Sequence, residues 1–230
     1  GEVPKICVLD PDGDLVRELR RDDRAKPDPT WACYHTELWL DEMKGYRVGV
    51  VGMAVGAPFA VLVAEELFAS GCRLLLSITS AGQLTPLGIP PYFVFIERAL
   101  RDEGTSGLYL PPAHWAQPSP SLAALVSQTL PSLAFPVLRG STWTTDAPFR
   151  ETQSAIDAAK SLGADLVEME AAALYAYSEA TECKVLCFAQ VTNQMAKEAG
   201  DFEKGAANGT IGVRELMVAF AKAWTSSAAN

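Results

Sequence analysis

The sequence has few of the residues that build metal sites. It contains two histidines, His35 and His114, and five cysteines. Cys183 and Cys187 form a C-x3-C pair, but no further cluster of cysteine or histidine accompanies them. A structural zinc site uses four such ligands, so we expect no metal. Most of the cysteines lie in apolar stretches, which indicates buried thiols.

Long apolar runs and long basic runs are also absent. No stretch approaches the roughly 18 apolar residues that a membrane span needs, and the N-terminal segment lacks the basic and apolar regions of a secretory leader. The formal net charge is −9, which disfavours binding to nucleic acid or to anionic membranes. We therefore expect a cytoplasmic protein that has neither nucleic acid nor a membrane as partner.

Two widespread enzyme motifs are missing. No G-x-S-x-G sequence marks a nucleophilic serine. The glycines of Val50–Gly56, VVGMAVG, do not have the spacing of a dinucleotide-binding loop. We therefore expect neither a serine hydrolase of that type nor a redox cofactor.

Strand and helix patterns alternate along the chain. Tyr46–Val55 is an apolar, β-branched run that is long enough for a buried strand, and a Gly-Ala-Pro sequence follows it. A helical stripe of apolar residues comes next over 59–70, and a second buried strand over 73–78. This strand–helix–strand unit predicts a doubly wound, mostly parallel sheet. No shift in composition marks a boundary, so we expect residues 1–230 to form a single domain.

The most informative segment is Val167–Tyr175, with the sequence VEMEAAALY. It places Glu168 and Glu170 on either side of Met169, where a short strand gives way to an alanine-rich helix. Acidic residues favour a helix N-terminus for electrostatic reasons alone. A carboxylate aimed into a cleft also accepts hydrogen bonds from sugar hydroxyls, and methionine supplies an adaptable apolar wall. Taken alone, the segment fits both explanations.

This segment resembles the ribose-binding sequence of nucleoside phosphorylases of the hexameric purine and uridine phosphorylase type, and of the related nucleosidases. The resemblance implies that Glu170 binds the ribose hydroxyls, that Met169 packs on the sugar and that Glu168 is a supporting carboxylate. It implies a three-layer α/β/α fold with a mixed, mostly parallel central sheet that curls toward a barrel. It also implies a homo-oligomer, because sites in this family often borrow residues across a subunit interface.

Other segments resemble the same family, in the same order, over most of the chain. They are Gly52–Pro58, Ser77–Gly82, Arg101–Ser106, Thr144–Thr152 and Val191–Asn193. The resemblance implies that Ser80 and the N–H groups of Ala81 and Gly82 position phosphate or water beneath the anomeric carbon of the sugar.

The resemblance also implies a set of base-binding residues. Phe149 would stack on the base, and Arg150, Asn193 and Gln194 would stabilise the charge that develops on it as it leaves. Purine phosphorylases and nucleosidases have an aspartate at the position of Asn193, as general acid. An amide hydrogen-bonds but does not donate a full proton, so this position is more similar to uridine phosphorylases.

Two phosphate-binding arginines of the family are missing. A Gly-Asp-Pro-x-Arg segment follows the first strand in many of these phosphorylases, and here that stretch is Asp10–Asp14, DPDGD. A second arginine of the family is replaced by Ser77. Bidentate guanidinium contacts to phosphate are hard to replace with hydroxyls. The loop sequence 79–82, TSAG, is similar to that of the nucleosidases, which use water.

The sequence therefore predicts an enzyme that binds a small-molecule nucleoside and cleaves its N-glycosidic bond. The resemblance implies inorganic phosphate as the co-substrate, with free base and ribose 1-phosphate as products. The missing arginines keep three alternatives open: hydrolysis on the same fold, a nucleoside-binding protein without activity, and a related enzyme with another sugar-linked substrate.

Overall fold

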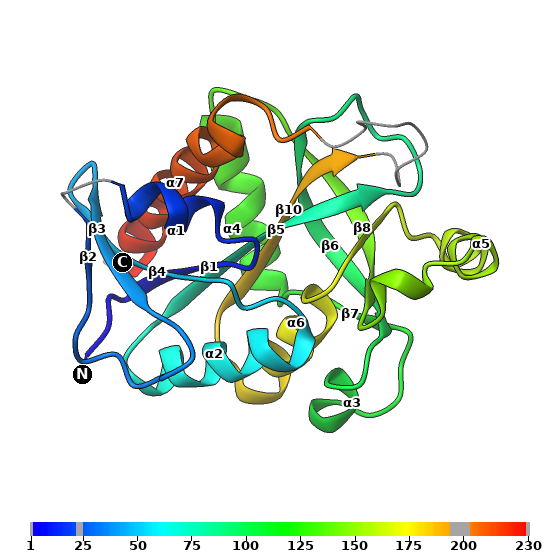
Figure 1. The fold of residues 1–230 in the computed structure, drawn as a ribbon, viewed down its shortest axis with the longest axis horizontal. Coiled ribbons are helices and arrows are strands. Elements are labelled where there is room, and N and C mark those ends of the chain that lie inside the picture. The colour runs from blue at the N-terminus through cyan, green and yellow to red at the C-terminus, as the bar shows by residue number, and fades with distance from the viewer. Residues whose placement is uncertain (1, 22–24, 194–202, 229–230) are drawn as a thin grey trace.

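The structure is a computed structural model that describes residues 2–21, 25–193 and 203–228. It shows a mixed α/β protein whose described strands join one ten-stranded sheet, with helices on both faces of that sheet (Figure 1). No helix in these three ranges is both long enough and apolar enough to cross a membrane.

Strand β1 (Ile6–Asp10) lies in the middle of the sheet. It pairs in parallel with β4 (Tyr46–Gly52) on one side and with β5 (Leu74–Gln83) on the other. Helix α2 (Ala57–Ala69) connects β4 to β5. The predicted strand–helix–strand unit is therefore confirmed, with β1 inserted between its two strands.

Beyond β5 the sheet curls until it closes. Strand β10 (Val185–Asn193) pairs in parallel with β5 and antiparallel with β6 (Tyr92–Asp102). Strand β6 pairs in parallel with β8 (Val137–Thr145), and β8 with β9 (Leu166–Glu168). Because β9 pairs back onto β5, antiparallel, these five strands form a closed barrel. The mixed sheet was expected to curl toward a barrel, and in the structure it closes fully.

Short antiparallel strands complete the sheet at its margins. Strands β3 (Leu38–Met43) and β2 (Lys26–Pro27) extend the open edge beyond β4, and β7 (Trp115–Ala116) adds to β6. The sheet is mixed as expected, and its parallel pairings are confined to the β4–β1–β5–β10 and β6–β8–β9 groups.

One face of the sheet is covered by α2 and α6 (Ala171–Thr181) (Figure 1). The alanine-rich sequence of α6 lets it pack closely, so that every residue from Ala171 to Ser178 is buried. Leu67 of α2 and Tyr175 of α6 belong to the same apolar core as Leu9 of β1. The helix that begins at the predicted ribose-binding sequence is therefore fixed along most of its length.

The other face is covered by α1 (Asp14–Leu19), α4 (Pro120–Thr129) and α7 (Thr210–Ala228) (Figure 1). Val8 of β1 contributes to this second core, together with Phe220 of α7. Successive strand side chains point to opposite faces, which explains why neighbouring residues of β1 serve different cores. The other helical elements lie in the connections: α3 (Ser106–Tyr109), α5 (Gln153–Leu162), η1 (Leu130–Ser132), η2 (Pro148–Arg150) and η3 (Ala206–Gly209).

Strand β5 runs further than the sequence predicts. The expected strand ends at Ile78, whereas β5 continues to Gln83. Its small residues read as a loop in the sequence, but β10 and β9 pair with them on both sides. The expectation that Ala81 and Gly82 belong to a loop is therefore wrong, since both are buried members of the barrel wall.

Candidate functional site

The predicted site residues converge where β5, β9 and β10 meet. Gly82 of β5 pairs with Val167 of β9 on one side and with Asn193 of β10 on the other. This register brings the expected anion side of the site, the ribose-binding sequence and Asn193 to one end of the barrel. Segments that are far apart in the chain thus meet at one end of the barrel.

Glu168 is buried and fully engaged with the protein. One carboxylate oxygen accepts hydrogen bonds from the N–H groups of Glu170 and Ala171, both at 2.8 Å. The other accepts from the hydroxyl of Thr144 at 2.5 Å and, more weakly, from that of Thr142 at 3.4 Å. Burial raises the pKa of Glu168, and these four donors oppose that shift. The residue fixes the turn from β9 into α6, which fits a supporting role.

Glu170 is only 1% exposed, yet half of its carboxylate lacks a partner. Its Oε1 accepts the N–H of Gly56 at 2.7 Å, whereas its buried Oε2 has no hydrogen-bond partner among the described residues. The side chain of Thr79 lies close enough to lower the pKa of Glu170 in part. Burial, with the charge of Glu168 adding to it, raises the pKa of Glu170 to about 8. An unpaired buried oxygen is costly, and a hydroxyl donor from a ligand would satisfy it.

Gly56 holds Glu170 through an unusual backbone conformation. It lies at the N-terminus of α2 with φ 91° and ψ 150°, a region that is open almost only to glycine. This conformation turns its N–H toward a carboxylate 114 residues away in the sequence. Met169, the predicted sugar-packing residue, is half-buried between the two glutamates.

The donors of Ser80 are already occupied by a carboxylate. Asp12 accepts the N–H of Ser80 at 2.9 Å and also its hydroxyl, both at Oδ2. Among the described residues, nothing donates to Oδ1 of Asp12. A side chain of the protein therefore lies where the resemblance places phosphate or water.

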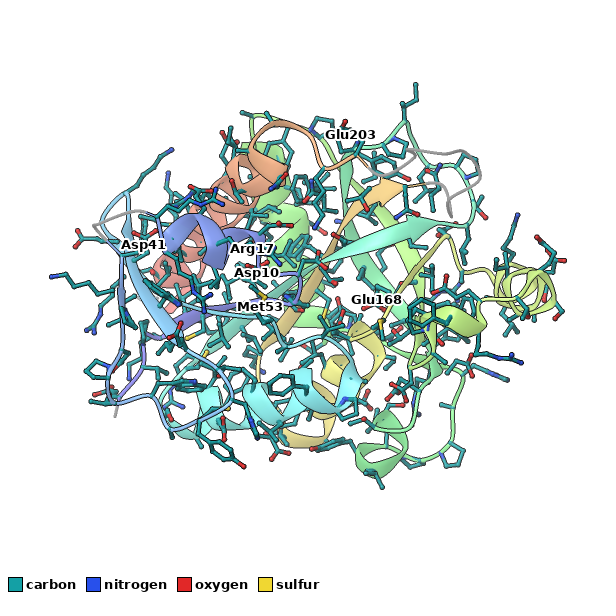
Figure 2. All side chains as sticks on the ribbon, in the orientation of Figure 1. Asp10, Arg17, Asp41, Met53, Glu168 and Glu203 are labelled. Atoms are coloured by element: carbon teal, nitrogen blue, oxygen red, sulfur yellow. The ribbon has the colours of Figure 1, made fainter. Side chains whose placement is uncertain are left out.

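Asp12 belongs to an acidic corner at the end of β1. Asp10 is buried and accepts the N–H of Val16 at 3.0 Å; burial raises its pKa to about 6. Asp14 pairs with Arg17 at 2.9 Å. Figure 2 shows Asp10, Arg17 and Met53 at this corner, and Met53 donates its N–H to the carbonyl of Asp10 at 3.2 Å.

A cavity of about 10 Å³ adjoins the acidic corner, which is room for about one water. Several polar side chains line it, among them Asp10, Asp12, Asp14, Thr79 and Gln190. In the ranges that the structure describes, no three His, Cys, Asp or Glu side chains are grouped so that they could hold a metal ion.

The base side of the site is less enclosed. Asn193 ends β10 and is half-buried, and its amide donates to the hydroxyl of Thr192 at 3.2 Å. Phe149 and Arg150 lie on η2 after β8, and the ring of Phe149 is fully exposed. Gln194 lies outside the described residues. The structure places these residues without testing their roles toward a base, which stay predictions.

The sequence analysis missed three groups that shape this site: Asp12, Gly56 and Lys204. The Nζ of Lys204 pairs with Asp14 and lies 3.3 Å from Oδ2 of Asp12. The run DPDGD at the end of a buried strand was a signal for Asp12, because acids replace the family's arginine there. No local signal identifies Lys204.

Known proteins share this fold and family pattern. A family model described as the phosphorylase superfamily matches residues 5–222. Purine nucleoside phosphorylase from Toxoplasma gondii, solved in complex with immucillin-H, superposes with a TM-score of 0.78 at 17% identity, covering 96% of this chain and 90% of that chain. Uridine phosphorylase from Vibrio fischeri, complexed with 6-hydroxy-1-naphthoic acid, gives a TM-score of 0.78 at 18% identity, covering 98% and 92%. No curated protein matches the sequence significantly.

Proposed function

Because this chain belongs to the phosphorylase superfamily, we propose that it is an enzyme that cleaves the N-glycosidic bond of a ribonucleoside. The observation that carries the proposal is the unpaired, buried Oε2 of Glu170. It provides an acceptor for a ribose hydroxyl at the same end of the barrel as Ser80 and Asn193. Met169 beside it supplies the apolar contact for the sugar ring.

Water is the nucleophile that this site favours. The two donors of Ser80 that would hold an anion are occupied by Asp12. A phosphate dianion placed there would face the carboxylates of Asp12 and Asp14, and like charges at such distances repel strongly in a partly buried site. A water molecule instead finds an acceptor at Oδ1 of Asp12.

The hydrolytic step then proceeds as follows. Asp12 takes a proton from water as the oxygen attacks the anomeric carbon, and the C–N bond breaks with its electron pair moving to the base. The amide of Asn193 hydrogen-bonds the leaving base, which takes its proton from solvent. The products are free ribose and free base. Glu170 holds the ribose hydroxyls, so that the reacting atoms stay aligned.

Phosphorolysis is a second candidate, which the position of Lys204 favours. Its ammonium group lies against Asp12 and Asp14 and supplies a cation that the missing arginines do not. In this case phosphate would displace Asp12 from Ser80, and the products would be base and ribose 1-phosphate.

The proposal is tested by incubating the protein with a panel of purine and pyrimidine nucleosides, with and without phosphate. Release of base and free ribose without phosphate is the expected result. Glu170→Gln should reduce kcat/KM by about 2- to 10-fold, the usual value of a hydrogen bond between neutral groups, because Glu170 is protonated in the neutral range. Glu179→Gln, exposed on the same helix, is the matched control.

The other outcomes separate the candidates. Release that requires phosphate and yields ribose 1-phosphate would replace hydrolysis with phosphorolysis. Nucleoside binding without any release would contradict both reactions and indicate a binding protein.

Assembly is a separate proposal. We propose a homo-oligomer because exposed apolar side chains gather near the N-terminus of α2. Val55 is 52% exposed and Leu62 43% exposed, and Tyr34 stacks on His35, which meets the ring of Phe59 edge-on. Sedimentation velocity should show a species larger than the monomer, and Leu62→Glu should shift it toward the monomer.

A further inference from the structure

A buried lysine from the C-terminal part of the chain reaches the proposed base. The side chain of Lys204 is only 13% exposed, and its Nζ lies 3.3 Å from Oδ2 of Asp12 and closer still to Oδ2 of Asp14. The same Oδ2 of Asp12 accepts both donors of Ser80. One carboxylate oxygen is thus held by three donors, while the other faces away from them.

The main chain around Lys204 is tied to the barrel wall beside Ser80. Gln190 donates its side-chain amide to the carbonyl of Lys204 at 2.6 Å, and the N–H of Glu203 donates to the carbonyl of Thr192 at 2.8 Å. Gln190 is the register partner of Ser80 across the β5–β10 pair. Ser80, Gln190, Lys204 and Asp12 therefore form a closed ring of contacts, in which each residue touches or pairs with the next and Asp12 returns to Ser80.

The chain that follows Lys204 passes close to Gln190. A Cβ atom at Gly209 would lie 2.1 Å from the amide nitrogen of Gln190, and Gly209 has a φ of 78° that side chains rarely adopt. Glycine at this position lets the chain pass close to Gln190 before it enters α7.

The charges around Asp12 explain why a cation is needed there. Asp12 faces other charged groups, namely the carboxylates of Asp10, Asp14 and Glu170 and, through its pair with Asp14, the guanidinium of Arg17. Among the ion pairs of the described residues, Lys204 is the cation that contacts Asp12 directly. Without it, Asp12 would stand among other acidic side chains, and repulsion from those that are ionised would favour movement away from them.

We infer that Lys204 is the positioning residue of the nucleophile side: it keeps Asp12 seated on Ser80, with Oδ1 directed at the attacking water. The inference rests on the proposed hydrolysis and adds a residue that acts through Asp12 without touching the substrate. Gln190 contributes to this positioning indirectly, because its side chain hydrogen-bonds the main chain of Lys204 and holds it in place.

The test compares kcat and KM in three variants. Lys204→Met removes the charge and keeps the length, Lys204→Arg keeps the charge, and Lys222→Met changes an exposed lysine of α7 as control. In Lys204→Met kcat should fall by about 10- to 100-fold, because Asp12 is no longer held in place beside the attacking water. The KM for the nucleoside should stay nearly unchanged, and Lys204→Arg and Lys222→Met should keep the wild-type kcat.

An unchanged kcat in Lys204→Met would overturn the inference, and so would an equal loss of kcat in Lys204→Arg, because the proposed role depends on the charge. If the wild type cleaves no nucleoside, the proposed function fails, and the carboxyl carbon of Asp12 is followed instead. Its NMR signal, assigned by comparison with Asp12→Asn, should move in Lys204→Met and keep its position in Lys222→Met. An unmoved signal in Lys204→Met would reject the role of Lys204 independently of any activity.

Discussion

Asp12 accepts two hydrogen bonds from Ser80, one from the main-chain N–H at 2.9 Å and one from the hydroxyl. These two residues lie 68 positions apart and meet at the end of the barrel where β5 passes β1. The contact means that the protein supplies its own anion to the place where a phosphorylase would need phosphate. In the proposed hydrolysis, it also places a carboxylate beside the attacking water.

Removing the carboxylate of Asp12 should change the nucleophile that the protein accepts. We expect Asp12→Ala to lose about 10²–10⁴-fold of the phosphate-independent rate, as for loss of a general base. Because the donors of Ser80 are then unoccupied and a like charge is gone, added phosphate should restore base release and yield ribose 1-phosphate. Product analysis with and without phosphate measures both effects. Asp157→Ala, an exposed acid of α5, is the control. An unaffected rate in Asp12→Ala would show that Asp12 is not the base.

The stability of the protein should decrease as the pH rises through the neutral range. The pKa of Glu170 is about 8 in the folded protein, above its ordinary value near 4.5. Between these values the folded state binds the extra proton, so the free energy of unfolding falls with increasing pH. Asp10, with a pKa of about 6, contributes to the acidic part of this decrease. Urea unfolding from pH 5 to pH 9 should show it.

Glu170→Gln isolates the upper part of that pH dependence. Glutamine does not ionise, so the decrease between about pH 6 and pH 8 should become clearly shallower, while the part due to Asp10 remains. Equal slopes for the wild type and Glu170→Gln in this window would argue against a neutral Glu170 in the folded protein.

Gly56→Ala should weaken both the fold and the ribose site. Its φ of 91° and ψ of 150° cost about 1–3 kcal/mol for a residue with a side chain. Relief of that strain would turn the N–H away from Glu170, so we expect a KM for the nucleoside about 2- to 10-fold higher, by the loss of one hydrogen bond. Thermal unfolding and steady-state kinetics measure the two effects. Gly107→Ala serves as control, because Gly107 has open space around it and no positive φ. A Gly56→Ala variant that behaves like Gly107→Ala would contradict the assignment.

Tyr175→Phe should destabilise the protein by about 1–3 kcal/mol, because two buried main-chain groups lose their partner. The Tyr175 hydroxyl donates to the carbonyl of Ile96 at 2.6 Å and accepts the N–H of Cys187 at 3.2 Å. It thereby ties α6 to β6 and β10. Urea unfolding of Tyr175→Phe and of Tyr177→Phe gives the comparison, because Tyr177 is a buried tyrosine of the same helix whose hydroxyl meets the thiol of Cys183. An equal loss of unfolding free energy in the two variants would mean that the hydrogen bonds of the Tyr175 hydroxyl do not stabilise the protein more than the contact of Tyr177.

Much of the fold was predictable because the signals are local. The apolar runs of β1, β4 and β10 and the periodic helix α2 follow from residues that lie next to one another. The extension of β5 was not predictable, because its residues 79–83 become strand only through pairing with β9 and β10. Strand β3 escaped prediction for a similar reason, since its half-exposed sequence is stabilised by pairing with β4.

For the site, the sequence by itself determined the junction that carries Glu168, Met169 and Glu170, because all three belong to one strand–helix turn with a recognisable order. It also determined that two arginines are missing. Only the tertiary structure decided what replaces them. Asp12 meets Ser80 across 68 residues, Gly56 meets Glu170 across 114, and Lys204 meets Asp12 across 192. Such contacts depend on the strand order and on the closure of the barrel, which no local pattern of residues encodes.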